Sequence, residues 1–166
     1  RRIVLPLVEA RLLLLLAVLR TRPLAKQLVT TPRRAAAARA NIEINKQMIA
    51  CEDPGELCTL IQSRVAEFNH VNVATAFRRL LQTRRQGVSR AVADQALWQL
   101  EASALLTMDD FQPQEISSTL HALAKARHAP SDPLLLDALE RQAEAVAGTF
   151  NAQDVANTLW AYATMG

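Results

Sequence analysis

The stretch FNAQDVANTLWAYATMG, residues Phe150–Gly166, decides the fold because it reads as a single helix with a well-marked start. Asn151 is a residue type favoured at a helix N-cap, and Asp154 follows at the spacing of a capping box. The apolar residues that follow are spaced at i, i+4 and i+7, which is one face of a helix: Val155, Leu159 and Tyr162. Phe150 can pack on Val155 as a hydrophobic staple.

The same pattern occurs twice earlier in the chain, after Phe68 and after Phe111. We number positions from each Phe and call the helix that follows it the motif helix. Apolar residues recur at +5, +9 and +12, with small or hydroxyl residues at +6 and +8. A leucine also lies eleven residues before each Phe, which predicts a partner helix in every unit: Leu57, Leu100 and Leu139. The Phe residues are 43 and 39 residues apart, a spacing typical of helical repeat arrays.

These copies place motif helices near 69–86, 112–127 and 151–165. Further starts are predicted where Asp53 and Asp132 each precede a proline, because proline is tolerated in the first turn. Pro113 is expected as the first residue of the second motif helix, and Gly87 as the C-cap of the first. The remaining helices are expected at Asn41–Ala50 and Ser89–Thr107.

The pattern F-x-P-Q-x-I/L-A-N-T-L-W-A-x-A, in a unit near 38 residues, resembles the octotricopeptide repeat. That repeat also occurs in proteins related to the Fas-activated serine/threonine kinase and RAP-domain families. Phe150–Gly166 matches best, Phe111–Ala126 matches well and Phe68–Thr83 is a looser copy, so the resemblance covers about 42–166. It implies an all-α, right-handed α-solenoid of helix–turn–helix repeats, about 38–43 residues each. It also implies RNA binding in chloroplasts or mitochondria, acting on transcript stability, processing, splicing or translation.

Composition divides the chain into two parts. Residues 1–40 hold nine Arg and Lys and one acidic residue, whereas residues 41–166 hold ten Arg and Lys and fifteen acidic residues. We interpret 1–40 as a basic, apolar leader, either an organellar transit peptide or an extra helix. Residues 41–166 form the repeat array, which we expect to be part of a longer one. The acidic balance of this array weakens a simple electrostatic case for nucleic-acid binding.

Candidate RNA-binding residues lie on the motif helices. A basic cluster near the end of the first is a candidate phosphate-contacting stripe, although cations there also complement a helix dipole: Arg78, Arg79, Arg84 and Arg85. Polar residues at +7, with His121 at +10, could face bases or form helix–helix hydrogen bonds: Thr75, Ser118 and Asn157. Trp160, also at +10, could stack on a base, but a core position is favoured because tryptophan mostly buries area.

No catalytic motif is present in the sequence. It contains no Gly-rich phosphate loop, no G-x-S-x-G and no metal-binding motif, and Cys51 and Cys58 lack metal or redox spacing. We therefore expect no enzyme activity, no metal, no cofactor and no small-molecule substrate. The expected partner is single-stranded RNA, an organellar transcript or ribosomal RNA, with other proteins of a ribonucleoprotein assembly. The alternative is a protein–protein scaffold, such as a helical-repeat component of an organellar ribosome.

Overall fold

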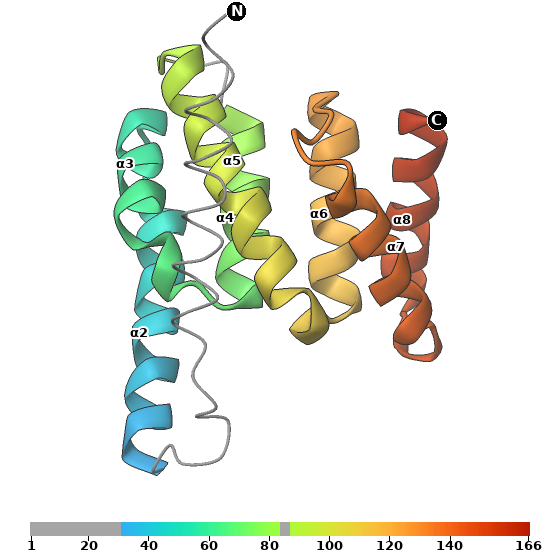
Figure 1. Cartoon of the computed structure of the whole chain (residues 1–166), viewed down its shortest axis with the longest axis horizontal. Helices are drawn as coiled ribbons and strands as arrows, with labels where there is room; N and C mark the ends of the chain where they lie inside the picture. Colours follow the sequence, from blue (N-terminus) through green and yellow to red (C-terminus); the bar gives the residue numbers. More distant parts are fainter. Residues whose placement is uncertain (1–30, 84–86) are drawn as a thin grey trace, which may run out of the picture. The chain divides into compact units, whose positions relative to one another are not determined.

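A computed structural model describes residues 31–83 and 87–166, with side chains from residue 34 onward (Figure 1). Of these residues, 84% are helical and none forms a strand, so the all-α prediction is confirmed. Contacts divide the chain into two units, Arg1–Arg39 and Ala40–Gly166, and the second unit contains all three motif Phe residues. Residues 84–86, at the end of the predicted 69–86 helix, lie outside the described residues, as do residues 1–30 of the predicted leader.

Seven α-helices occupy the part of the chain that the structure describes. They are α2 (Thr31–Ala50), α3 (Pro54–Arg64), α4 (His70–Thr83), α5 (Arg90–Thr107), α6 (Pro113–Ala126), α7 (Leu134–Ala145) and α8 (Ala152–Met165). The helix expected at Asn41–Ala50 begins ten residues earlier, at Thr31. The physical reason is the alanine-rich run before Asn41, since alanine has the highest helix propensity.

Each of the three motif Phe residues follows a short 3-10 turn. These turns are η2 (Val65–Glu67), η3 (Met108–Asp110) and η4 (Ala147–Thr149). The Phe residues have nearly the same extended backbone, with φ between −68° and −65° and ψ between 129° and 135°. Each Phe N–H donates to the carbonyl three residues earlier. The sequence repeat is therefore also a repeat of local geometry.

Within Ala40–Gly166 the helices pack in two rows. The motif helices α4, α6 and α8 contact one another in that order, and the partner helices α3, α5 and α7 do the same (Figure 1). Each of α5 and α7 also packs on the motif helix that precedes it in the chain. The core lies between the rows and includes fully buried residues at +5, +9 and +12 of the first two motif helices: Val73, Phe77, Leu80, Ile116, Leu120 and Leu123.

The predicted helix starts are confirmed at three places. The Asp154 N–H donates to Asn151 Oδ1 at 2.9 Å, and the Asn151 N–H donates to Asp154 Oδ2 at 3.4 Å, which completes a capping box. The Gly55 N–H donates to Asp53 Oδ1 at 2.9 Å at the start of α3. Pro113 is the first residue of α6. These bonds satisfy backbone donors that a helix N-terminus leaves without internal partners.

The predicted cap at Asp132 is wrong by one residue. The Leu134 N–H donates to Asp132 Oδ1 at 3.0 Å, but Pro133 takes the N-cap position and α7 begins at Leu134. The Asp132 carbonyl accepts from Leu135, three residues later, whereas the Asp53 carbonyl accepts from Leu57, four residues later. The tighter first turn delays the start of the α-helix.

Gly87 has φ +70°, the left-handed conformation that favours glycine.

Candidate nucleic-acid interface

A groove of about 550 Å³ runs across the motif helices α4, α6 and α8. We call it the motif-helix groove. Positions +7, +10 and +14 line it because residues three, four and seven apart share one face of a helix. This face differs from the core stripe at +5, +9 and +12. The lining side chains are Arg78, Leu81 and Gln82 of α4, Ser118, His121, Ala122, Lys125 and Ala126 of α6, and Asn157 of α8.

The groove brings together four of the eight candidate residues, which are Arg78, Ser118, His121 and Asn157. Thr75 is half-buried on α4 and is not among the lining residues. Two polar lining residues were missed from the sequence, Gln82 and Lys125. Both lie at +14, so extending the +7 and +10 register by one helical turn would have found them.

Arg79 has a different environment from Arg78. Its Nε donates to the Met48 carbonyl at 3.3 Å, and its Nη2 donates to the Cys51 carbonyl. Carbonyls at a helix C-terminus lack partners within the helix, and a cation there also complements the dipole. Arg79 therefore joins α4 to the end of α2. These bonds occupy the guanidinium, so Arg79 is not a candidate phosphate contact.

The structure describes only part of the remaining basic cluster. Arg84 and Arg85 lie outside the described residues. Arg90, the nearest cation after them, forms an exposed ion pair with Asp94 at 3.4 Å. Arg78 is thus the member of this basic cluster that is found among the described lining residues of the groove.

The motif-helix groove is locally cationic although the repeat region is acidic overall. Arg78 and Lys125 are exposed at its edge, His121 is half-buried, and the described lining residues include no Asp or Glu. Cationic side chains along a concave surface raise the local concentration of anions. A cationic groove of this kind favours an anionic ligand.

Polar groups in the groove remain available to a ligand. Asn157 Oδ1 accepts from Gln153 Nε2 at 2.9 Å, while Asn157 Nδ2 makes no hydrogen bond to any other residue that the structure describes. Ser118 Oγ donates to the Glu115 carbonyl at 3.2 Å and retains its acceptor lone pairs. An amide and a hydroxyl at equivalent +7 positions are suited to reading donor and acceptor groups.

An aromatic pair lies at +10 of the last two motif helices. The His121 and Trp160 rings have centroids 4.8 Å apart and are tilted by 40°. Trp160 is 45% exposed, so the prediction of a core position for it is wrong. Trp160 occupies the same +10 position as Arg78 and His121. The apolar stripe of α8, at +5, +9 and +12, lies on a different face of the helix. An exposed indole beside a polar groove offers a flat surface on which a base can stack.

Among the described residues, no group of three or more His, Cys, Asp or Glu is placed to hold a metal ion, and none of the helices is long and apolar enough to cross a membrane. Burial is the largest cause that raises the pKa of the Cys51 and Cys58 thiols, which disfavours the reactive thiolate.

Comparisons with protein-family models, curated proteins and solved structures find no match to this chain.

Proposed function

We propose that the chain is a right-handed α-solenoid of octotricopeptide-type repeats that binds single-stranded RNA. Two observations support the solenoid. The three Phe residues share one backbone geometry after equivalent 3-10 turns, and motif and partner helices stack in separate rows. Stacked helical repeats form extended surfaces in which equivalent positions face the same way. The first motif helix extends this series less regularly in sequence than the other two.

The observation that carries the RNA proposal is the convergence of equivalent positions from three motif helices on one acid-free groove. In this mechanism Arg78 and Lys125 contact phosphates, because Arg and Lys supply the charge that holds a nucleic-acid backbone. Ser118, His121 and Asn157 face bases, as varying side chains do in other repeat proteins that read RNA. Trp160 offers a stacking surface at one end of this series.

The biological effect follows from occupancy, without chemistry by this chain. A bound repeat array shields RNA from nucleases or keeps it unstructured, which changes transcript stability, processing or translation. We propose an organellar transcript or ribosomal RNA as the target, in a mitochondrion or chloroplast. This location rests on the repeat resemblance and on the basic composition of residues 1–40.

The proposal is tested by measuring how RNA affinity depends on salt. We expect the full chain to bind a pool of single-stranded RNAs, with affinity that falls as salt rises. The double variant Arg78→Ala/Lys125→Ala removes both exposed cations of the groove. Its salt slope should be smaller by about 1.4, since each phosphate contact to a single strand contributes about 0.7. Fluorescence anisotropy at several salt concentrations measures this slope.

A matched control is Arg90→Ala/Arg141→Ala, which removes the same charge from two exposed residues that do not line the groove. Because residues 1–40 are strongly basic and could bind RNA themselves, the test rests on the difference between the two double variants. Equal losses in both would mean that binding depends on overall charge, and the groove would then not be the RNA site.

The second candidate is a protein–protein scaffold. It is favoured by the excess of acidic residues over 41–166 and by an exposed apolar surface on α8. If the folded chain fails to bind RNA at low salt, this candidate replaces the first. Circular dichroism of the same sample, showing helical structure, separates that outcome from a failure to fold.

A further inference from the structure

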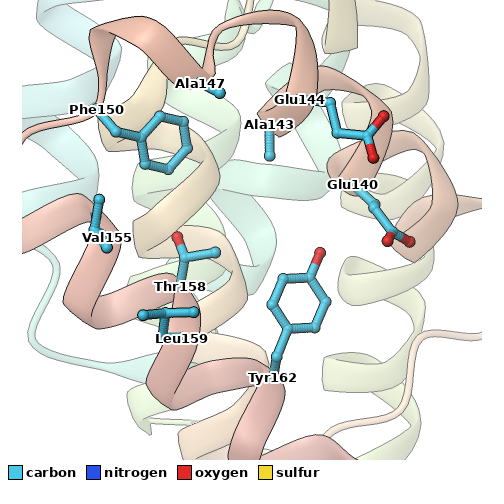
Figure 2. A pocket seen from close by; sticks show the side chains of 9 residues that line it. All are labelled: Glu140, Ala143, Glu144, Ala147, Phe150, Val155, Thr158, Leu159 and Tyr162. Carbon is cyan, nitrogen blue, oxygen red and sulfur yellow. The ribbon is translucent and has the colours of Figure 1, made fainter.

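A second groove, of about 320 Å³, lies between α7 and α8 (Figure 2). We call it the end groove. Its α8 wall carries the apolar stripe of the third motif helix, with Val155, Leu159 and Tyr162 exposed by 43%, 65% and 38%. In Figure 2 these side chains stand on one side of the groove, opposite α7. Three large apolar residues exposed on one face form a patch, unlike the single apolar residues that are scattered over most protein surfaces.

The equivalent groove one repeat earlier is filled. The residues at +5, +9 and +12 of α6 are Ile116, Leu120 and Leu123, and all three are fully buried. The helix that follows in the chain, α7, packs on α6. The same holds one repeat earlier still, where α5 packs on α4. A motif helix in this fold is thus covered by the next partner helix, and within the described residues α8 has none.

The opposite wall of the end groove shows the same relation. Glu140 and Ala143 of α7 lie ten and seven residues before Phe150, where α5 has Glu101 and Ala104 before Phe111. Glu101 and Ala104 are buried, and α7 packs on α5. Glu140 is exposed and Ala143 is half-buried. Both walls therefore match surfaces that are covered by a helix one repeat earlier.

Glu101 shows how the covering helix is held in place. Its Oε2 accepts from the Ser131 N–H at 2.9 Å, and its Oε1 lies 3.2 Å from His128 Nε2. Both partners belong to the loop that leads into α7. A charged acceptor paired with a backbone donor is a strong, directional contact. Glu140 presents the same carboxylate at the equivalent position of the end groove.

We infer that the end groove is the docking site of one more helix of the α5 and α7 type. Its apolar residues, spaced as Leu135 and Leu139 are in α7, would lie against Val155, Leu159 and Tyr162. The loop before it would donate a backbone N–H to Glu140, and its cations would complement Glu144 at the groove edge. The two earlier grooves of this chain are filled by such a helix, which argues for it over a small molecule. The inference does not depend on RNA binding.

The test extends the chain with its own covering element. Gly166 lies sixteen residues after Phe150, as Arg127 does after Phe111, so a copy of residues 128–149 joined directly to Gly166 is in register. We expect the extended chain to unfold about 5–10 °C higher than the native chain, because the added helix buries the exposed stripe. Tyr162 is the only tyrosine, so its reaction with a nitrating reagent should also slow several-fold.

A control extension carries aspartate at the positions copied from Leu135 and Leu139. It should leave the unfolding temperature and the nitration rate at the values of the native chain. Glu140→Ala provides a second check. Because Glu140 is exposed, this substitution should not change the unfolding temperature of the native chain, but it should remove part of the temperature gain in the extended chain.

Two results would overturn the inference. The first is an extended chain whose unfolding temperature and Tyr162 nitration rate equal those of the control extension. The second is a native chain that sediments as a dimer and becomes monomeric on Leu159→Asp, since the groove would then bind a second copy of this chain. A native chain that sediments as a monomer and is stabilised by the extension supports the inference.

Discussion

The helices α6 and α8 have closely related sequences in different surroundings. Both begin with capping-box residues, and both carry apolar residues at +5, +9 and +12. The stripe of α6 is fully buried, whereas that of α8 is exposed over most of its length. In the part of the chain that the structure describes, α6 is covered by the partner helix α7, and no further partner helix covers α8. Residue pattern thus sets which face a helix offers to a core, while burial depends on whether a neighbour occupies that face.

The largest expected contrast is between the two leucines at +9. Leu120→Ala removes a fully buried side chain and should lower the free energy of unfolding by about 2–5 kcal/mol. Leu159→Ala acts on a side chain that is 65% exposed and should cost less than about 0.5 kcal/mol. Urea unfolding followed by circular dichroism measures both. A cost for Leu159→Ala close to that of Leu120→Ala would show that α8 is covered in solution.

A smaller contrast is expected between the carboxylates at +4. Asp154 Oδ1 accepts from Ser117 Oγ of α6 at 2.9 Å, in addition to its capping bond. Glu115 caps α6 through the Gln112 N–H at 3.1 Å. The α4 residue equivalent to Ser117 is Ala74, which offers no hydroxyl to Glu115. Asp154→Ala should therefore cost about 2–3 kcal/mol and Glu115→Ala about 1 kcal/mol.

Ser117→Ala tests the explanation for that difference. It removes the hydrogen bond between Ser117 of α6 and Asp154 of α8 but keeps the capping box of α8. Its cost should therefore account for most of the difference between Asp154→Ala and Glu115→Ala. Thermal unfolding of the single and double variants gives the coupling energy between the two side chains. Additive effects would mean that the hydrogen bond contributes little to joining these helices.

Local features were predictable from the sequence because they depend on neighbouring residues in the chain. The Asn151–Asp154 capping box and the start of α6 at Pro113 require only the right residue types at short spacing. The face at +7 and +10 was predictable for the same reason, since helical periodicity is local. The all-α class followed from the repeated apolar spacing, which occurs three times.

Features that depend on distant residues were not predictable. Arg79 and Arg78 are adjacent in the sequence, but Arg79 is bound to carbonyls of α2, about 30 residues away, and Arg78 lines the groove. Trp160 was expected in the core because of its size, yet position +10 lies outside the core stripe. Tertiary packing decided both cases. Arg84 and Arg85 stay as predictions because the structure does not describe them.

The smallest expected effect concerns position +12, where α6 has Leu123 and α8 has Tyr162. Burial raises the pKa of the Tyr162 phenol, and the carboxylates of Glu140 and Glu144 raise it further. Glu140→Gln/Glu144→Gln should therefore lower this pKa, yet leave it above its ordinary value because burial is the larger cause. Absorbance of the phenolate during a pH titration measures the shift directly, because no other tyrosine is present.

This pKa shift also fixes the sign of a pH effect on stability. A phenol whose pKa is higher in the folded chain stabilises it fully below the unfolded pKa, about 10, and this contribution is lost as pH rises through the folded pKa. Tyr162→Leu, which restores the residue found in α6, should remove that loss. Its stability should then fall less steeply above about pH 10 than that of the native chain. Equal slopes would mean that Tyr162 is solvated as in the unfolded chain, and that the α8 wall of the end groove is more open than Figure 2 shows.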